Sequence, residues 1–264
     1  MIMSDNSHYW KGKHDRIKKA KEHVALMKEK YGKEIDESKK RTIIYDEKHT
    51  FLQGNENTGK TQFVFTNEDT VSALMHCNPD KVGKMAVLNF ASYKMPGGFF
   101  LAGSGAQEEC LCHESTLYNV LVQFEGSYYN PNKKALNRAL YKNRALYSPD
   151  IVFTREKNIV KADVITCAAP NRATARRYQD VSDEDNSAAL LSRIEFIRDI
   201  SLENHVDTLI LGAWGCGVFG QDYKEVADMI NDVFKNAGFK YVICAVPGNT
   251  ATAEYFERKF KKTS

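Results

Sequence analysis

Residues 87–118 read VLNFASYKMPGGFFLAGSGAQEECLCHESTLY and carry the most informative pattern of the chain. They continue the apolar run Met85–Phe90, whose composition is typical of a buried strand. Residues 91–106 are rich in glycine and contain Pro96, so they can continue neither a strand nor a helix. A helical pattern then begins at three polar residues, Gln107, Glu108 and Glu109. This order of elements, in which a strand is followed by a flexible loop, two carboxylates and a helix, predicts a functional site.

The helical pattern that starts at Gln107 has a face of residues at spacings of three and four. That face comprises Leu111, Ser115 and Tyr118, with Leu117 and Leu121 beside them. Glu108 and Glu109 fall in the first turn on different faces of the helix, so we expect them to have different tasks. Acidic residues also occur in the first turn of any helix because they complement the helix dipole, and this structural role stays open on the pattern alone.

A second glycine motif, GCGVFG at residues 215–220, lies between the predicted strand Thr208–Leu211 and the predicted helix Tyr223–Phe234. A turn in this context can bind a phosphate, because glycines let the backbone approach closely and a helix N-terminus favours negative charge. A nicotinamide-binding Rossmann site is disfavoured, since the motif lies late in the chain and the next strand, residues 241–246, is followed by no acidic residue for the ribose.

Residues 54–61, GNENTGKT, match the phosphate-loop pattern letter by letter. That loop works only where a strand enters it and a helix leaves it. Here the following residues, Gln62–Thr66, alternate and are rich in aromatic and β-branched side chains, which predicts a strand. We therefore expect a turn between two strands, and an ATPase is the less favoured interpretation.

The N-terminal residues 8–40 are highly charged and have apolar side chains at helical spacing, with a break expected at Gly32. We expect an accessory helix packed on the main domain, with a solvated arm as the alternative, and divide the chain into residues 1–42 and 43–264. The other predicted elements are a helix over residues 69–77 capped by Thr66 or Asn67, short strands at residues 151–153 and 164–167, a helix over residues 188–204, and irregular segments at residues 128–150 and 172–187.

The composition is that of a single soluble α/β domain. With 264 residues, 42% of them hydrophobic and 27% charged, the chain can bury a full core, and no stretch is long enough to span a membrane. The net charge of +3 is mild, and we attribute the lysine-rich segments to solvated helix faces rather than to direct nucleic-acid binding. Six cysteines without a CxxC pair or a signal peptide predict free thiols in the cytoplasm. Cys110, Cys112 and His113 lack a second ligand cluster, so we expect no metal site.

Both glycine-bearing loops follow predicted strands, and in open α/β sheets ligands lie at the carboxyl ends of strands. One loop offers backbone amides for a diphosphate, and the other offers carboxylates. A ligand with both a diphosphate and a reacting centre fits this pair of loops.

These residues resemble the signature of the microbial-type poly(ADP-ribose) glycohydrolases, a branch of the macrodomain superfamily, in which three glycines precede Gln-Glu-Glu by six to eight residues. Gly97, Gly98 and Phe99 stand at the glycine positions, and the seven residues 100–106 separate them from Gln-Glu-Glu at residues 107–109. The third glycine is thus replaced by phenylalanine. Further matches are LNFAS at residues 88–92, CAAPN at residues 167–171 and LGAWGCGVFG at residues 211–220.

The resemblance implies an α/β fold of the macrodomain type, with three α/β/α layers around a central mixed sheet, in addition to the N-terminal accessory helix. It makes Glu109 the catalytic acid, Glu108 and Gln107 the residues that position the ribose and the loop, and Asn89 the partner of a ribose hydroxyl. The implied diphosphate site comprises Gly215, Cys216, Gly217, Val218, Phe219 and Gly220, with Phe219 packed on the terminal ribose. No cofactor is implied.

The implied activity is hydrolysis of ribose–ribose O-glycosidic bonds in poly(ADP-ribose) on modified proteins. We expect the protein to be a monomer. An ADP-ribose-binding reader and a mono-ADP-ribosyl hydrolase are the alternatives. Phe99 bears on this choice, because either the backbone there is not left-handed or the ring occupies space beside the ligand.

Overall fold

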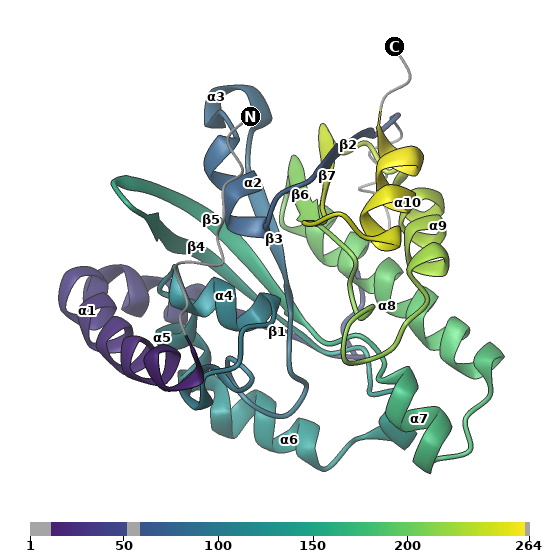
Figure 1. Ribbon diagram of the computed structural model, residues 1–264, viewed down its shortest axis with the longest axis horizontal. Helices are drawn as coiled ribbons and strands as arrows, with labels where there is room; N and C mark the ends of the chain where they lie inside the picture. The colour runs from purple at the N-terminus through teal and green to yellow at the C-terminus, as the bar shows by residue number, and fades with distance from the viewer. Residues whose placement is uncertain (1–11, 52–58, 262–264) are drawn as a thin grey trace.

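The computed structural model describes residues 12–51 and 59–261. These residues form a seven-stranded mixed sheet between two layers of helices (Figure 1), with strand order β1-β4-β5-β3-β6-β7-β2. The strands are β1 (Ile43–Tyr45), β2 (Gln62–Thr66), β3 (Met85–Phe90), β4 (Ala145–Arg155), β5 (Asn158–Cys167), β6 (Thr208–Leu211) and β7 (Tyr241–Ala245). The five strands from β5 to β2 are parallel, whereas β4 runs antiparallel to β5 and β1 antiparallel to β4. The predicted three-layer α/β/α fold with a mixed sheet is confirmed.

Side chains alternate between the two faces of the sheet and meet a different helical layer on each face. In β3, Leu88 faces the core formed with α8 (Asp183–Glu203), α9 (Tyr223–Phe234) and α10 (Ala251–Phe260). Val87 faces the core formed with α2 (Thr70–His76), α4 (Gln107–His113) and α5 (Leu117–Leu121). Because helices cover both faces of β3, its sequence is a continuous apolar run. The remaining α-helices are α1 (Gly12–Arg41), α3 (Pro79–Val82), α6 (Asn130–Lys133) and α7 (Arg172–Tyr178).

The strands predicted at Met85–Phe90, Gln62–Thr66 and Thr208–Leu211 and the helix predicted at Tyr223–Phe234 are confirmed. Because a strand follows Thr61, the phosphate-loop match at residues 54–61 lacks the helix that it would need. The turn expected before this strand lies mostly outside the described residues.

The single long helix expected from Gln107 onward is wrong. Helix α4 ends at His113, and α5 begins only at Leu117. Between them the backbone pairs with β4, since the Thr154 amide donates to the Glu114 carbonyl (2.7 Å) and the Thr116 amide donates to the Val152 carbonyl (3.0 Å). Tertiary hydrogen bonds therefore override the local helical pattern in this segment.

Two segments predicted to be irregular are ordered instead. Residues 172–187 contain α7 and the start of α8, which is capped by Ser182, whose Oγ accepts from the Asp185 amide (3.0 Å). Residues 128–150 contain the beginning of β4, where Pro149 lies in a bulge between Ser148 and Ile151. A bulge interrupts the ladder and so tolerates a proline within a strand.

Two further expectations concern helix ends. The cap of α2 is Asp69, which accepts from the amides of Val71 and Ser72, and not Thr66 or Asn67. Helix α1 is kinked at Tyr31, one residue before the expected break at Gly32. Its expected beginning at residue 8 lies outside the described residues.

Helix α1 packs on the domain instead of forming a solvated arm. The Arg16 Nε donates to the Gly103 carbonyl (2.7 Å), and the Asn119 side chain donates to the Val24 carbonyl (3.0 Å). The N-terminal helix therefore contacts the glycine-rich loop directly. In the described part of the chain, no helix has both the length and the apolar character to cross a membrane.

Candidate active site

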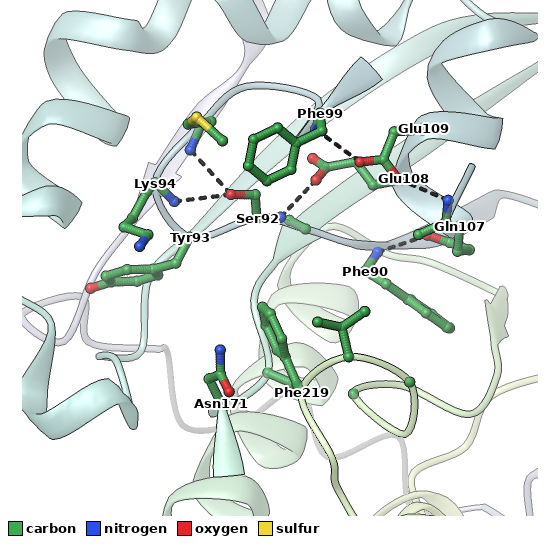
Figure 2. A pocket seen from close by; sticks show the side chains of 18 of the residues that line it. Phe90, Ser92, Tyr93, Lys94, Phe99, Gln107, Glu108, Glu109, Asn171 and Phe219 are labelled. Carbon is green, nitrogen blue, oxygen red and sulfur yellow. Dashed lines mark hydrogen bonds between the residues drawn. The ribbon is translucent and has the colours of Figure 1, made fainter. Parts of the chain in front are cut away.

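A cavity of about 810 Å³ opens at the carboxyl ends of β3, β5 and β6. Its wall comes from the loop after β3, the first turn of α4, the end of β5 and the glycine loop after β6 (Figure 2). The two loops singled out in the sequence thus face one cavity, because they follow neighbouring parallel strands.

Glu108 is buried beneath this cavity and is held on both carboxylate oxygens. Its Oε2 accepts from the Ser92 amide (2.7 Å), and its Oε1 accepts from the Asn89 side-chain amide (3.2 Å). Burial raises the pKa of Glu108 to about 8, although these hydrogen bonds act in the opposite direction. Burial thus favours the protonated form of this carboxyl group.

Glu109 is fixed by the loop that it follows. Its Oε1 accepts from the Phe99 amide (2.9 Å), and its Oε2 accepts from the Ala106 amide (3.0 Å). The second bond closes the first turn of α4 in the manner of a capping box, with Ala106 in the cap position. The carboxylate is thus held in one orientation at the cavity wall.

Gly98 brings the loop backbone onto both carboxylates. Its φ is +58°, and a Cβ atom there would lie 2.5 Å from Glu109 Oε1 and 2.9 Å from Glu108 Oε2. Gly97 has φ +66°, and a Cβ atom there would lie 2.7 Å from the ring of Tyr118. Both positions need glycine for its conformation and for space.

Phe99 adopts φ −102°, so the backbone at this position needs no glycine. Its side chain is 61% exposed and lines the cavity. The backbone at Phe99 is thus not left-handed, and its ring also occupies space at the cavity, so both consequences considered for the replaced glycine hold.

Gln107 and Asn89 support the site. The Gln107 Oε1 accepts from the Phe90 amide (2.9 Å), and its Nε2 donates to the Leu88 carbonyl (2.9 Å), which ties α4 to the end of β3. Asn89 is fully buried behind Glu108 and does not line the cavity. Its side-chain amide donates to Glu108, and its Oδ1 has no hydrogen-bond partner among the described residues, so the contact of Asn89 with a ribose hydroxyl stays a prediction.

The glycine loop after β6 lines the cavity and contains three backbone amides without an acceptor in residues 12–51 and 59–261. The amides of Gly217, Val218 and Phe219 donate to no other group in the described residues, and Val218 is 87% exposed. The loop is closed behind them by the Gln221 amide, which donates to the Gly215 carbonyl (3.0 Å). Adjacent unpaired amides of this kind form a site for an anion.

Only some of the residues predicted to bind the ligand line the cavity. Gly215, Gly217, Val218 and Phe219 line the cavity, whereas Cys216, Gly220 and, on the other loop, Gly97 do not. The N-terminus of α9 was expected to add dipole charge, but Asp222 caps it and accepts from the Lys224 amide (2.8 Å). The loop amides, rather than the helix end, are thus free for an anion.

Aromatic side chains form the far side of the cavity, and this feature was not predicted from the sequence. Tyr141 stacks on Tyr93 with ring centroids 4.3 Å apart, and its ring meets the edge of Phe219 at 6.2 Å. Tyr141 has a left-handed backbone, φ +60°, and its neighbour Leu140 accepts from the buried Arg193 (3.3 Å). No local signal marks such a residue, because a long-range contact fixes its place.

Lys94, Lys133 and Asn171 also line the cavity and were not predicted. Asn171 is the last residue of the CAAPN segment, which resembles the family signature. This resemblance could have indicated that Asn171 belongs to the site. Lys94 lies between the matched segments at residues 88–92 and 97–98 but belongs to neither, and Lys133 lies in a segment that carried no motif.

The three α/β/α layers around a mixed sheet, with two glutamates and a glycine loop at one cavity, define a fold of the macrodomain type. Residues 13–156 match the family model for the microbial-type PARG catalytic domain, and the chain therefore belongs to this family.

Solved structures agree with this assignment. The poly(ADP-ribose) glycohydrolase from Thermomonospora curvata, bound to the inhibitor ADP-HPD, is 27% identical, with a TM-score of 0.83 over 94% of this chain and 100% of that one. The Deinococcus radiodurans poly(ADP-ribose) glycohydrolase in complex with ADP-ribose is 28% identical, with a TM-score of 0.77 over 86% of this chain and 97% of that one. No curated protein sequence matches the chain.

Proposed function

We propose that this protein hydrolyses the ribose–ribose O-glycosidic bonds of poly(ADP-ribose) and releases ADP-ribose. The observation that carries the proposal is the pair of fixed carboxylates, Glu108 and Glu109, which share one cavity with the free amides of residues 217–219. The similar enzymes from Thermomonospora curvata and Deinococcus radiodurans bind ADP-HPD and ADP-ribose, which supports the same ligand class here.

Cleavage of a glycosidic bond needs an acid that protonates the leaving oxygen and a base that activates water, with an oxocarbenium-like transition state between them. We assign both tasks to Glu109. Two backbone amides orient its carboxylate at the cavity wall, so it meets the bond in a constant position.

Glu108 has a different task, as its position on another face of the helix predicts. Burial favours the protonated form of its carboxyl group, and in that form it can donate a hydrogen bond to a ribose hydroxyl. We propose that it positions the ribose whose anomeric carbon lies next to Glu109.

The diphosphate of ADP-ribose binds the loop after β6 in this proposal. The free amides of Gly217, Val218 and Phe219 are suited to an anion, and Phe219 lies where it can pack on the terminal ribose.

The cavity is complete within one chain, so we propose that a monomer is active. The six free cysteines fit a reducing compartment, which favours the cytoplasm.

The proposed function is tested by incubating the protein with a poly(ADP-ribosyl)ated acceptor protein and quantifying released ADP-ribose by chromatography. Release of free ADP-ribose with shortening of the polymer is the expected result. Binding of ADP-ribose without any release would identify a reader. Release only from a mono-ADP-ribosylated acceptor would identify a mono-ADP-ribosyl hydrolase in which Phe99 excludes the polymer.

A further inference from the structure

Two lysines line the cavity and have no role in the site described above. Lys94 lies in the loop after β3, and Lys133 is the last residue of α6. Both side chains are exposed, and neither ammonium group forms an ion pair with another described residue. Apart from Glu108 and Glu109, no acidic residue of the described chain lines the cavity, so this region of the wall is cationic.

These lysines lie on the side of β3 that faces β5 and β4. The loop that carries Lys94 is tied there through Tyr93, whose carbonyl accepts from the Asn132 side chain (2.9 Å) and whose hydroxyl donates to the Ala135 carbonyl (3.2 Å). Asn132 directly precedes Lys133, so the same bonds bring the two lysines to one end of the cavity. The glycine loop follows β6, on the other side of β3.

Phe99 lies beside the proposed acid on this same wall. Its amide donates to Glu109, and its ring is 61% exposed. In Figure 2 the ring is drawn between Lys94 and the two glutamates. Neither lysine is neutralised by an ion pair with a described residue, although Lys133 Nζ donates to Asn130 Oδ1 (3.0 Å). An exposed aromatic ring in the same cavity as these two cations fits a ligand that has both a flat base and phosphate groups.

We propose that Lys94, Lys133 and Phe99 form a subsite for the leaving unit of poly(ADP-ribose). This inference rests on the proposed function. The unit bound by the glycine loop places its anomeric carbon at Glu109, and the bond that breaks joins this carbon to a ribose hydroxyl of the next unit. That next unit carries its own diphosphate and adenine. The lysines bind this second diphosphate as point charges, and the Phe99 ring stacks on the adenine.

The subsite makes a polymer-specific contribution to binding, because free ADP-ribose has no leaving unit. The substrate class favoured by this end of the cavity is therefore a chain of ADP-ribose units rather than ADP-ribose attached to an uncharged acceptor. This interpretation makes the Phe99 ring a contact for the polymer instead of an obstacle to it.

The test compares wild type with a Lys94→Met, Lys133→Met double variant. We expect the KM for poly(ADP-ribose) to rise about tenfold or more, as the loss of two charge-assisted contacts implies, with kcat changed by less than about threefold. The Kd for free ADP-ribose should stay within about twofold, and the KM should depend less on salt than in wild type. Phe99→Leu should raise the same KM without weakening ADP-ribose binding.

Two control variants make the result specific. Lys134→Met removes an exposed cation next to Lys133 that does not line the cavity, and its KM should equal that of wild type. Lys94→Arg, Lys133→Arg retains both charges and should restore most of the affinity for polymer.

An unchanged KM in the Met double variant, with active wild type, would overturn the leaving-unit subsite and leave the proposed function intact. Equal weakening of free ADP-ribose and polymer would also overturn it, because the lysines would then bind the first unit. Absence of ADP-ribose release by wild type itself would refute the proposed function and the subsite with it.

Discussion

Gly98 is the residue on which the geometry of both carboxylates depends. The loop backbone passes so close to Glu108 and Glu109 that no side chain fits at position 98, and the positive φ adds a conformational reason for glycine. The Glu-Glu pair and the glycines of the loop are thus parts of one packing arrangement.

Replacing Gly98 by alanine should displace the Glu109 carboxylate, because the new Cβ would lie 2.5 Å from Oε1. We expect kcat/KM for poly(ADP-ribose) to fall by about 100-fold, the order associated with misplacing a catalytic group by an ångström. Gly105→Ala is the matched control, since a Cβ atom at position 105 has no neighbour closer than 3.9 Å. Equal activities of the two variants would contradict the tight contact at Gly98.

Glu108 links the chemistry of the site to the stability of the fold. Its pKa in the folded protein is about 8, raised by burial from an ordinary value of 4.5. The folded state therefore binds this proton more tightly than the unfolded state. The resulting stability is fully present below about pH 4.5 and is lost as the pH rises through 8.

Chemical denaturation at several pH values tests this linkage. Between the two pKa values, Glu108 should lower the free energy of unfolding of wild type by up to about 1.4 kcal/mol per pH unit. Glu108→Gln lacks the titrating group, so its stability relative to wild type should increase over this range. Glu125→Gln, at an exposed position, is the control and should follow the wild-type profile. Parallel profiles for wild type and Glu108→Gln would mean that Glu108 is ionised at neutral pH.

At the scale of elements, helix α1 acts on the site through the glycine-rich loop. The Arg16 Nε donates to the Gly103 carbonyl, and a Cβ atom at Gly103 would lie 2.6 Å from the Lys13 carbonyl. The same loop ends at Ala106, whose amide holds Glu109. We propose that the N-terminal segment, divided from residues 43–264 on sequence grounds, is needed to hold the catalytic loop.

Arg16→Met removes one hydrogen bond between α1 and this loop without removing the aliphatic packing of the side chain. We expect kcat for polymer hydrolysis to fall by about three- to tenfold, with an unchanged circular dichroism spectrum. Lys18→Met, on an exposed position of the same helix, should leave kcat as in wild type. A wild-type kcat for Arg16→Met would show that α1 does not order the loop.

The elements that the sequence predicted well are those whose pattern is determined locally. The strand Met85–Phe90 and the helix Tyr223–Phe234 have the expected bounds because their apolar spacing matches their burial. The break of the helical pattern at residues 114–116 and the strand through Pro149 depend on pairing with distant segments. Such pairing leaves no periodic signal in either segment alone.

At the scale of the whole molecule, the sheet order brings the site together. Both glycine loops were expected at the carboxyl ends of strands, and the parallel pairing of β3 with β6 places them on one cavity. The position of β5 and β4 on the other side of β3 was not readable from the sequence. For this reason Tyr93, Tyr141 and the two lysines were missed, whereas Glu108 and Glu109 were found.

Asn89 shows the same limit for a residue that was predicted. Its place in a matched segment identified it as important, but the segment alone does not show which way the side chain lies. In the folded chain it donates to Glu108 and Thr166 from within the core. These contacts account for the side-chain nitrogen of Asn89, whereas its Oδ1 has no partner among the described residues and its predicted role toward the ribose stays a prediction.

The central claim is that Glu109 performs the glycosidic chemistry, and the most direct test measures turnover and binding on the same variant. Glu109→Gln should lower kcat for ADP-ribose release from poly(ADP-ribose) by about 100-fold or more, the contribution expected of a general acid and base. Its Kd for ADP-ribose should stay within about threefold of wild type, because the diphosphate loop is untouched. Release by Glu109→Gln at the wild-type rate would contradict the assignment of Glu109.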